Sequence, residues 1–146
     1  MTVNIGDVIN RSKEEWKALQ NGEKPLILVG TATCGRSAGS LEVLEAFREE
    51  SCNLGIDCNI IEVGCIGLCY AEPIACITKP SRPGICYGHL NPGIAKELIE
   101  SYLINDNTLP NYALGTFGDG SLESIPRLFQ AGRTGAASYR VSPCPL

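Results

Sequence analysis

The segment Cys65-Ile-Gly-Leu-Cys69 contains the residues best suited to chemistry in this sequence. Two thiolates four positions apart in a glycine-containing loop can converge on one metal centre. Glycine permits the backbone turns that such wrapping requires, and it leaves amide N–H groups free to point at sulfur. A third cysteine, Cys34, lies in the small-residue stretch 30–39. We therefore take Cys34, Cys65 and Cys69 as candidate metal ligands.

The spacing of these cysteines is compatible with more than one kind of site. Thiolates are the usual ligands of an iron–sulfur cluster. Paired cysteines two to four residues apart also occur in zinc sites, and a disulfide or buried thiols would need no metal. His89 is the only histidine, so any metal site must be rich in thiolates. The pattern favours an iron–sulfur site, with zinc binding and a metal-free structure as the alternatives.

Length and composition limit the architecture and the class of partner. The chain has 146 residues, which is enough for one domain. A formal net charge of −4 disfavours a general nucleic-acid binder. The sequence has no apolar run long enough to span a bilayer and no secretory signal at its start. We therefore expect a cytoplasmic, reducing environment, in which clustered cysteines more often bind metal or do redox chemistry.

Hydrophobic periodicity predicts an α/β fold. Helices are expected over residues 6–20 and 40–51 and from Pro92 to Tyr102, and strands over 26–29, 58–63, 73–78 and 85–87. This order of elements is that of a thioredoxin-like domain, with about four strands in a mixed sheet and flanking helices. The expected organisation is an N-terminal helix in residues 1–24, the thioredoxin-like domain in 25–104, and an irregular linker or tail in 105–146.

This arrangement would bring the three candidate ligands together. Cys34 follows the first predicted strand, and Cys65 follows the second. Because loops at the carboxyl ends of neighbouring strands meet in space, we expect Cys34, Cys65 and Cys69 to converge at one edge of the sheet.

Two segments resemble a known family. These are Val29-Gly-Thr-Ala-Thr-Cys34-Gly-Arg-Ser-Ala-Gly39 and Val63-Gly-Cys-Ile-Gly-Leu-Cys-Tyr-Ala-Glu-Pro73. They closely resemble the thioredoxin-like [2Fe-2S] ferredoxin domain. That domain precedes the flavin module in flavoprotein subunits of NADH dehydrogenases and electron-bifurcating hydrogenases, and it also occurs as a small subunit in hydrogenase operons. The resemblance runs from Trp16 to Leu103, and the Tyr112–Phe129 segment is similar to the connector that leads into the flavin domain.

The resemblance implies a function and a set of partners. Cys34, Cys65 and Cys69 would hold a [2Fe-2S] cluster that relays single electrons within an NADH-linked oxidoreductase complex. The implied partners are a flavoprotein and other iron–sulfur subunits, with no nucleic acid and no membrane insertion. The chain shows no complete catalytic site of its own. The alternatives are a structural or docking domain with a degenerate cluster site, or a zinc-binding thiolate domain.

The sequence departs from the family pattern at the fourth ligand. Four-cysteine relatives place two ligands around the first loop, whereas this loop has only Cys34. Val29 and Gly39 cannot coordinate a metal through their side chains. Either the cluster is incomplete or its fourth ligand comes from elsewhere, and the candidates are Cys58, Cys76, Cys86 and Ser37. The three cysteines in this group lie in predicted strands, where a buried thiol acting as a small hydrophobe is the more common role. Cys52 and Cys144 are expected to be exposed, inert thiols.

Overall fold

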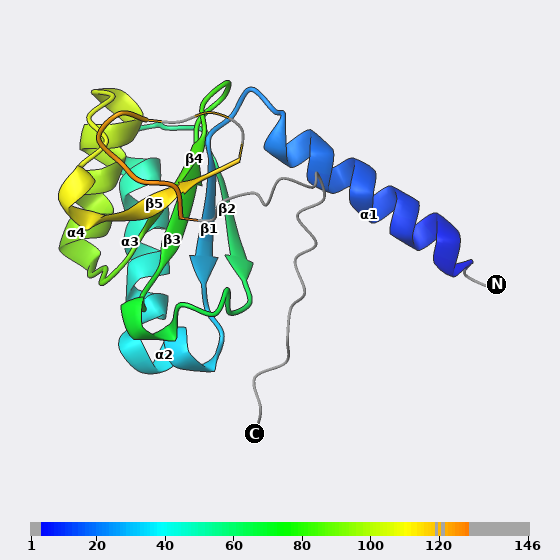
Figure 1. Cartoon of the computed structure of the whole chain (residues 1–146), viewed down its shortest axis with the longest axis horizontal. Coiled ribbons are helices and arrows are strands. Elements are labelled where there is room, and N and C mark those ends of the chain that lie inside the picture. The colour runs from blue at the N-terminus through cyan, green and yellow to red at the C-terminus, as the bar shows by residue number, and fades with distance from the viewer. Residues whose placement is uncertain (1–3, 119, 121, 129–146) are drawn as a thin grey trace.

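Five short strands form one mixed sheet in the computed structural model of the chain, which describes residues 4–118, 120 and 122–128. The strands lie in the order β2-β1-β3-β4-β5 (Figure 1). β1 and β2 are parallel, and the remaining neighbours are antiparallel. The bounds are Leu26–Gly30 for β1, Asn59–Val63 for β2, Ala75–Thr78 for β3, Gly84–Tyr87 for β4 and Ala113–Phe117 for β5.

Four α-helices accompany the sheet in the described part of the chain. They are α1 (Ile5–Gln20), α2 (Thr33–Ala38), α3 (Ser40–Asn53) and α4 (Pro92–Leu98), the last of which continues into a π-helical turn, Ile99–Ile104. α3 and α4 pack against each other on one side of the sheet (Figure 1). The start of α4 is the predicted one: the Asn91 side chain accepts a hydrogen bond from the Ile94 amide at 2.9 Å, and proline occupies the first turn.

The main core lies between the sheet and these two helices. Val29 and Phe47 are among its fully buried members, with 0% of their surface exposed. Because successive strand side chains alternate between faces, the intervening residues point to the opposite side. A smaller cluster forms there from Ala71, Ile74, Cys76 and Cys86.

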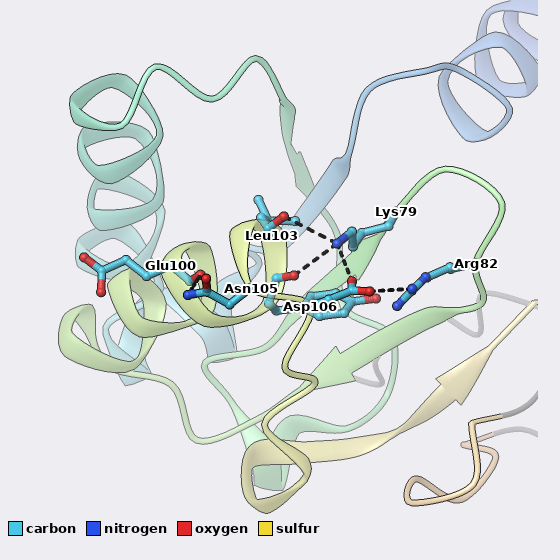
Figure 2. Close-up of polar contacts among 7 residues, drawn as sticks. Lys79, Arg82, Glu100, Leu103, Asn105 and Asp106 are labelled. Carbon is cyan, nitrogen blue, oxygen red and sulfur yellow. Dashed lines mark hydrogen bonds and ion pairs between the residues drawn. The ribbon is translucent and has the colours of Figure 1, made fainter.

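Lys79 anchors the C-terminal end of the π-helical turn that follows α4. Lys79 Nζ donates hydrogen bonds to the carbonyl oxygens of Tyr102 (3.2 Å) and Leu103 (3.4 Å) and to Asp106 Oδ1 (2.6 Å), as Figure 2 shows. Arg82 pairs with the other carboxylate oxygen of Asp106. The hydrogen bond from Lys79 is the main cause that lowers the pKa of Asp106 below its ordinary 3.8. These contacts satisfy carbonyls that a helix end leaves without partners.

The structure differs from the sequence-based expectation at two elements. The small-residue stretch after β1 contains α2, whose Thr-Cys-Gly-Arg-Ser-Ala sequence has no apolar periodicity to reveal it. The sheet also has a fifth strand, β5, within the segment that was expected to be a tail. Gly115 in β5 allows the backbone of Leu128 to lie close to this strand, because a Cβ at position 115 would be 2.7 Å from the Leu128 backbone nitrogen. The rest of the expected tail, residues 129–146, lies outside the described residues.

α1 stands apart from this packing. It contributes no buried residue, and four of its apolar side chains are exposed, from 41% at Trp16 to 75% at Ile5. Figure 1 shows the helix extending away from the sheet. Among the described residues, no helix combines the length and the hydropathy needed to cross a membrane.

Candidate metal centre

The parallel pair β1 and β2 positions the three candidate cysteines. Gly30, the last residue of β1, is in register with Val63, the last residue of β2, so both chains leave the sheet at the same edge. The chain after β1 turns into α2, which carries Cys34. The chain after β2 enters the loop that carries Cys65 and Cys69, and α2 lies at the same end of the sheet (Figure 1).

The loop 65–69 turns back on itself and places its two thiols in contact. The Sγ atoms of Cys65 and Cys69 are 3.4 Å apart, and the Gly67 amide donates to Cys65 Sγ at 3.3 Å. Gly67 has a φ of 89°, in the left-handed region that L side chains rarely adopt. This glycine therefore closes the turn and aims a backbone N–H at sulfur, as the sequence suggested.

Cys34 reaches the same point from α2. Hydrogen bonds with Cys65 and then with Cys34 are the largest causes that raise the pKa of Cys69 to about 12 from its ordinary 9.0. Cys69 is therefore in contact with Cys65 and lies close enough to Cys34 for that thiol to raise its pKa, so the two segments approach each other at this point. Cys69 is exposed, whereas Cys34 and Cys65 are half-buried.

The donor set is suited to a binuclear centre. One thiol from α2 and two from the loop 65–69 approach each other, and thiolates are the usual ligands of iron–sulfur clusters. Among the described residues, no three or more His, Cys, Asp or Glu side chains are grouped so that they could hold one metal ion. Cys65 and Cys69 are in contact, and Cys34 lies near Cys69.

Small residues allow α2 to lie close to the end of β1. A Cβ at Gly35 would stand 2.3 Å from the Gly30 carbonyl oxygen, so only glycine fits at position 35 with this backbone. Since Gly35 directly follows Cys34, this close approach fixes where the Cys34 thiol lies.

The structure separates the candidates for a fourth ligand. Cys58 precedes β2 and is therefore at the opposite end of that strand from Cys65, where its Sγ donates to Ser51 Oγ at 3.3 Å. Val29 is fully buried in the core. Ser37 is exposed and lies one helical turn beyond Cys34, on the same side of α2.

Cys76 and Cys86 are joined to each other by a disulfide. Their burial was expected, but their bond was not, and it removes both from the list of free thiols. The two residues are direct cross-strand partners in the β3–β4 hairpin. The sequence contained a signal for this pairing: Cys76 and Cys86 are each five residues from Ser81 in the turn, so a hairpin centred there places them opposite each other. Cys52 is exposed as expected, and Cys144 lies outside the described residues.

The raised pKa of Cys69 predicts that metal binding depends on pH. Because the thiol is protonated near pH 8 and the ligand form is the thiolate, Zn²⁺ binding to the metal-free protein should release a proton from Cys69. The affinity for Zn²⁺ should therefore rise as the pH rises from 6 to 9. Calorimetry in buffers of different ionisation enthalpy measures this proton release. The Cys69→Ser variant should release fewer protons, and equal release from both proteins would contradict the prediction.

Comparison with known proteins identifies relatives in sequence and in fold. No family model matches the chain. It is 34% identical over 89 residues to the NADP-reducing hydrogenase subunit HndB of Solidesulfovibrio fructosivorans, a match that covers 60% of this chain and 70% of the relative.

Two solved structures of a thioredoxin-like [2Fe-2S] ferredoxin from Aquifex aeolicus share the fold. The first has a TM-score of 0.58 at 20% identity and covers 67% of this chain and 96% of the ferredoxin. The second, at 1.5 Å resolution, has a TM-score of 0.56 at 22% identity and covers 64% and 99%. The predicted thioredoxin-like α/β fold is confirmed.

Proposed function

The chain belongs to the family of the NADP-reducing hydrogenase subunit HndB, and from this premise we propose that it is an electron-transfer module carrying a [2Fe-2S] cluster. The observation that carries the proposal is the meeting of Cys34, Cys65 and Cys69 at one edge of the sheet. These three thiolates would hold the cluster, which supplies one-electron redox chemistry when bound. The Gly67 amide would direct a hydrogen bond at the sulfur of Cys65 and so contribute to the reduction potential.

The same proposal includes the setting in which the module works. Its name places HndB in a hydrogenase, and we propose that this chain likewise works in a complex with a flavoprotein and other iron–sulfur subunits of an NADH-linked oxidoreductase. The exposed position of Cys69 supports this, because an electron donor or acceptor can then approach the site closely. We propose the cytoplasm as its compartment: five of the described cysteines are free, and the Cys76–Cys86 disulfide is the feature that a reducing compartment does not explain.

Ser37 is the fourth-ligand candidate that the proposal retains. It lies three residues after Cys34 on α2, so both side chains are on one face of the helix. A Ser37→Cys substitution would then complete a four-thiolate set and should increase the amount of cluster that survives purification. Optical spectra of wild type and variant, normalised to protein, measure the change. An unaltered cluster content and spectrum would exclude position 37 from coordination.

The experiment that tests the proposed function is anaerobic purification followed by iron and sulfide analysis. The wild-type chain should contain close to two iron and two sulfide per chain, with visible absorption that dithionite bleaches. Cys34→Ala should lose most of the iron, whereas Cys58→Ala should retain it because Cys58 lies at the far end of β2. A colourless, iron-free wild-type protein would favour a docking domain, and one equivalent of zinc without iron would favour a zinc-binding domain.

A further inference from the structure

Glu72 is a half-buried carboxylate that is not one of the proposed cluster ligands. It lies three residues after Cys69 and directly before Pro73, at the start of the segment that leads into β3. Its Oε2 accepts a hydrogen bond from the Ile74 amide at 2.9 Å. Burial raises the pKa of Glu72 above its ordinary 4.5, the Ile74 amide partly offsets this, and no charged group contributes.

The Glu72 carboxylate lies against the chain segment that carries Cys34. A Cβ built at Gly30 would lie 3.2 Å from Glu72 Oε1, and one at Gly35 would lie 3.2 Å from Oε2. Gly30 ends β1 and Gly35 follows Cys34. Glu72, three residues after Cys69, therefore lies against the segment that carries Cys34.

Arg36 and Glu62, two charged residues on the elements that flank the site, make their hydrogen bonds and ion pairs with residues other than Glu72. Arg36, on the same helix as Cys34, donates through Nε to the Thr31 carbonyl at 2.9 Å. Glu62 on β2 accepts from Thr31 Oγ1 at 3.0 Å and pairs with Arg48. Among the ion pairs of the described residues, none includes Glu72. Its negative charge is therefore not neutralised by a neighbouring side chain there.

We propose that Glu72 is a positioning residue that holds the Cys34 helix against the Cys69 loop and lowers the reduction potential of the cluster. The inference rests on the proposed [2Fe-2S] function. Reduction adds an electron to the centre, and a fixed negative charge nearby opposes that step. Because the carboxylate is partly removed from solvent, this repulsion is screened less than it would be for a surface carboxylate. The net charge around a cluster is among the factors that set its potential.

The Glu72→Gln variant tests the charge while preserving the shape of the side chain. At pH 8 the variant should be easier to reduce than the wild-type protein. We expect about a tenfold change in the equilibrium constant for reduction, which is ~59 mV for a one-electron couple. A redox titration followed by electron paramagnetic resonance measures the midpoint potential. The Glu97→Gln variant is the matched control, since Glu97 is an exposed carboxylate on α4 and its replacement should leave the potential unchanged.

A second variant separates the two parts of the role. Glu72→Ala removes both the charge and the contact of the side chain with the Gly30–Gly35 segment. It should therefore raise the reduction potential and also lower the iron content per chain. If Glu72→Gln and Glu97→Gln shift the potential equally, the inference about Glu72 is wrong while the cluster assignment stands. If the wild-type chain contains no iron or sulfide, the proposed function itself fails, and this result is distinct from the first.

Discussion

Alanine in place of Gly35 is expected to displace α2 and to remove most of the iron from the protein. The new Cβ would lie 2.3 Å from the carbonyl oxygen of Gly30, and neither group can rotate away because the obstacle is backbone. Alanine normally favours a helix over glycine by about 1 kcal/mol. Overpacking in a close-packed region costs about 1–3 kcal/mol, so the clash should outweigh that gain. Cys34 would move with the helix and leave Cys69.

Thermal unfolding and iron analysis measure the two consequences of this change. The matched control is Gly64→Ala, which alters the glycine directly before Cys65. A Cβ at Gly64 has no heavy atom within 4 Å, and its backbone is outside the left-handed region. Gly64→Ala should therefore keep both stability and iron. A Gly35→Ala protein with wild-type iron content would show that the α2–β1 contact does not position Cys34.

Replacement of Lys79 by methionine is expected to destabilise the fold by about 2–3 kcal/mol. Lys79 is only 16% exposed, and its ammonium group serves two helix-end carbonyls in addition to Asp106. Hydrogen bonds to charged groups contribute about 1.5–3 kcal/mol each, and methionine recovers part of the loss by filling the same volume. Urea unfolding of wild type and variant gives the difference.

The loss should depend on pH in a defined direction. The pKa of Asp106 is lowered in the folded state, so its stabilising pairing is fully present above its unfolded pKa of 3.8 and is lost as the pH falls through the folded value. The difference between wild type and Lys79→Met should therefore narrow in acid. Lys24→Met is the control: Lys24 pairs with Asp57 at 2.6 Å, but both side chains are more than half exposed, so the change should be within about 1 kcal/mol. Equal losses at both sites would contradict the role given to Lys79.

Periodicity and turn chemistry were enough to predict most of the architecture. The apolar run of β1 and the Asn91-Pro92 start of α4 are local signals, and the structure places β1 and the start of α4 within one residue of the prediction. β5 and α2 were missed for a physical reason: both depend on contacts with distant residues. Gly115 fits against Leu128, and Gly35 fits against Gly30, and neither contact leaves a pattern in the nearby sequence.

In the candidate site, too, local sequence signals predicted some features, and contacts between distant residues determined the others. The spacing of Cys65 and Cys69 and the position of Cys34 after a strand predicted their convergence. The fourth position could not be resolved from sequence, because Cys58 and Ser37 differ in which end of the sheet they occupy rather than in their local sequence. The role proposed for Glu72 depends on contacts with Gly30 and Gly35, about forty residues earlier, and the sequence alone did not place Glu72 against them.

The isolation of α1 has a consequence for how this protein can change over time. Since α1 has no buried residue, we expect substitutions along it to change the free energy of the sheet and its thiol site little, except at Trp16, which lines a pocket with Leu26 and Leu28 of β1. Selection can therefore change Ile5, Val8 and Ile9, which are exposed, with little effect on the thiol site. The exposed face of α1 and the thiol site can in this sense change independently of each other.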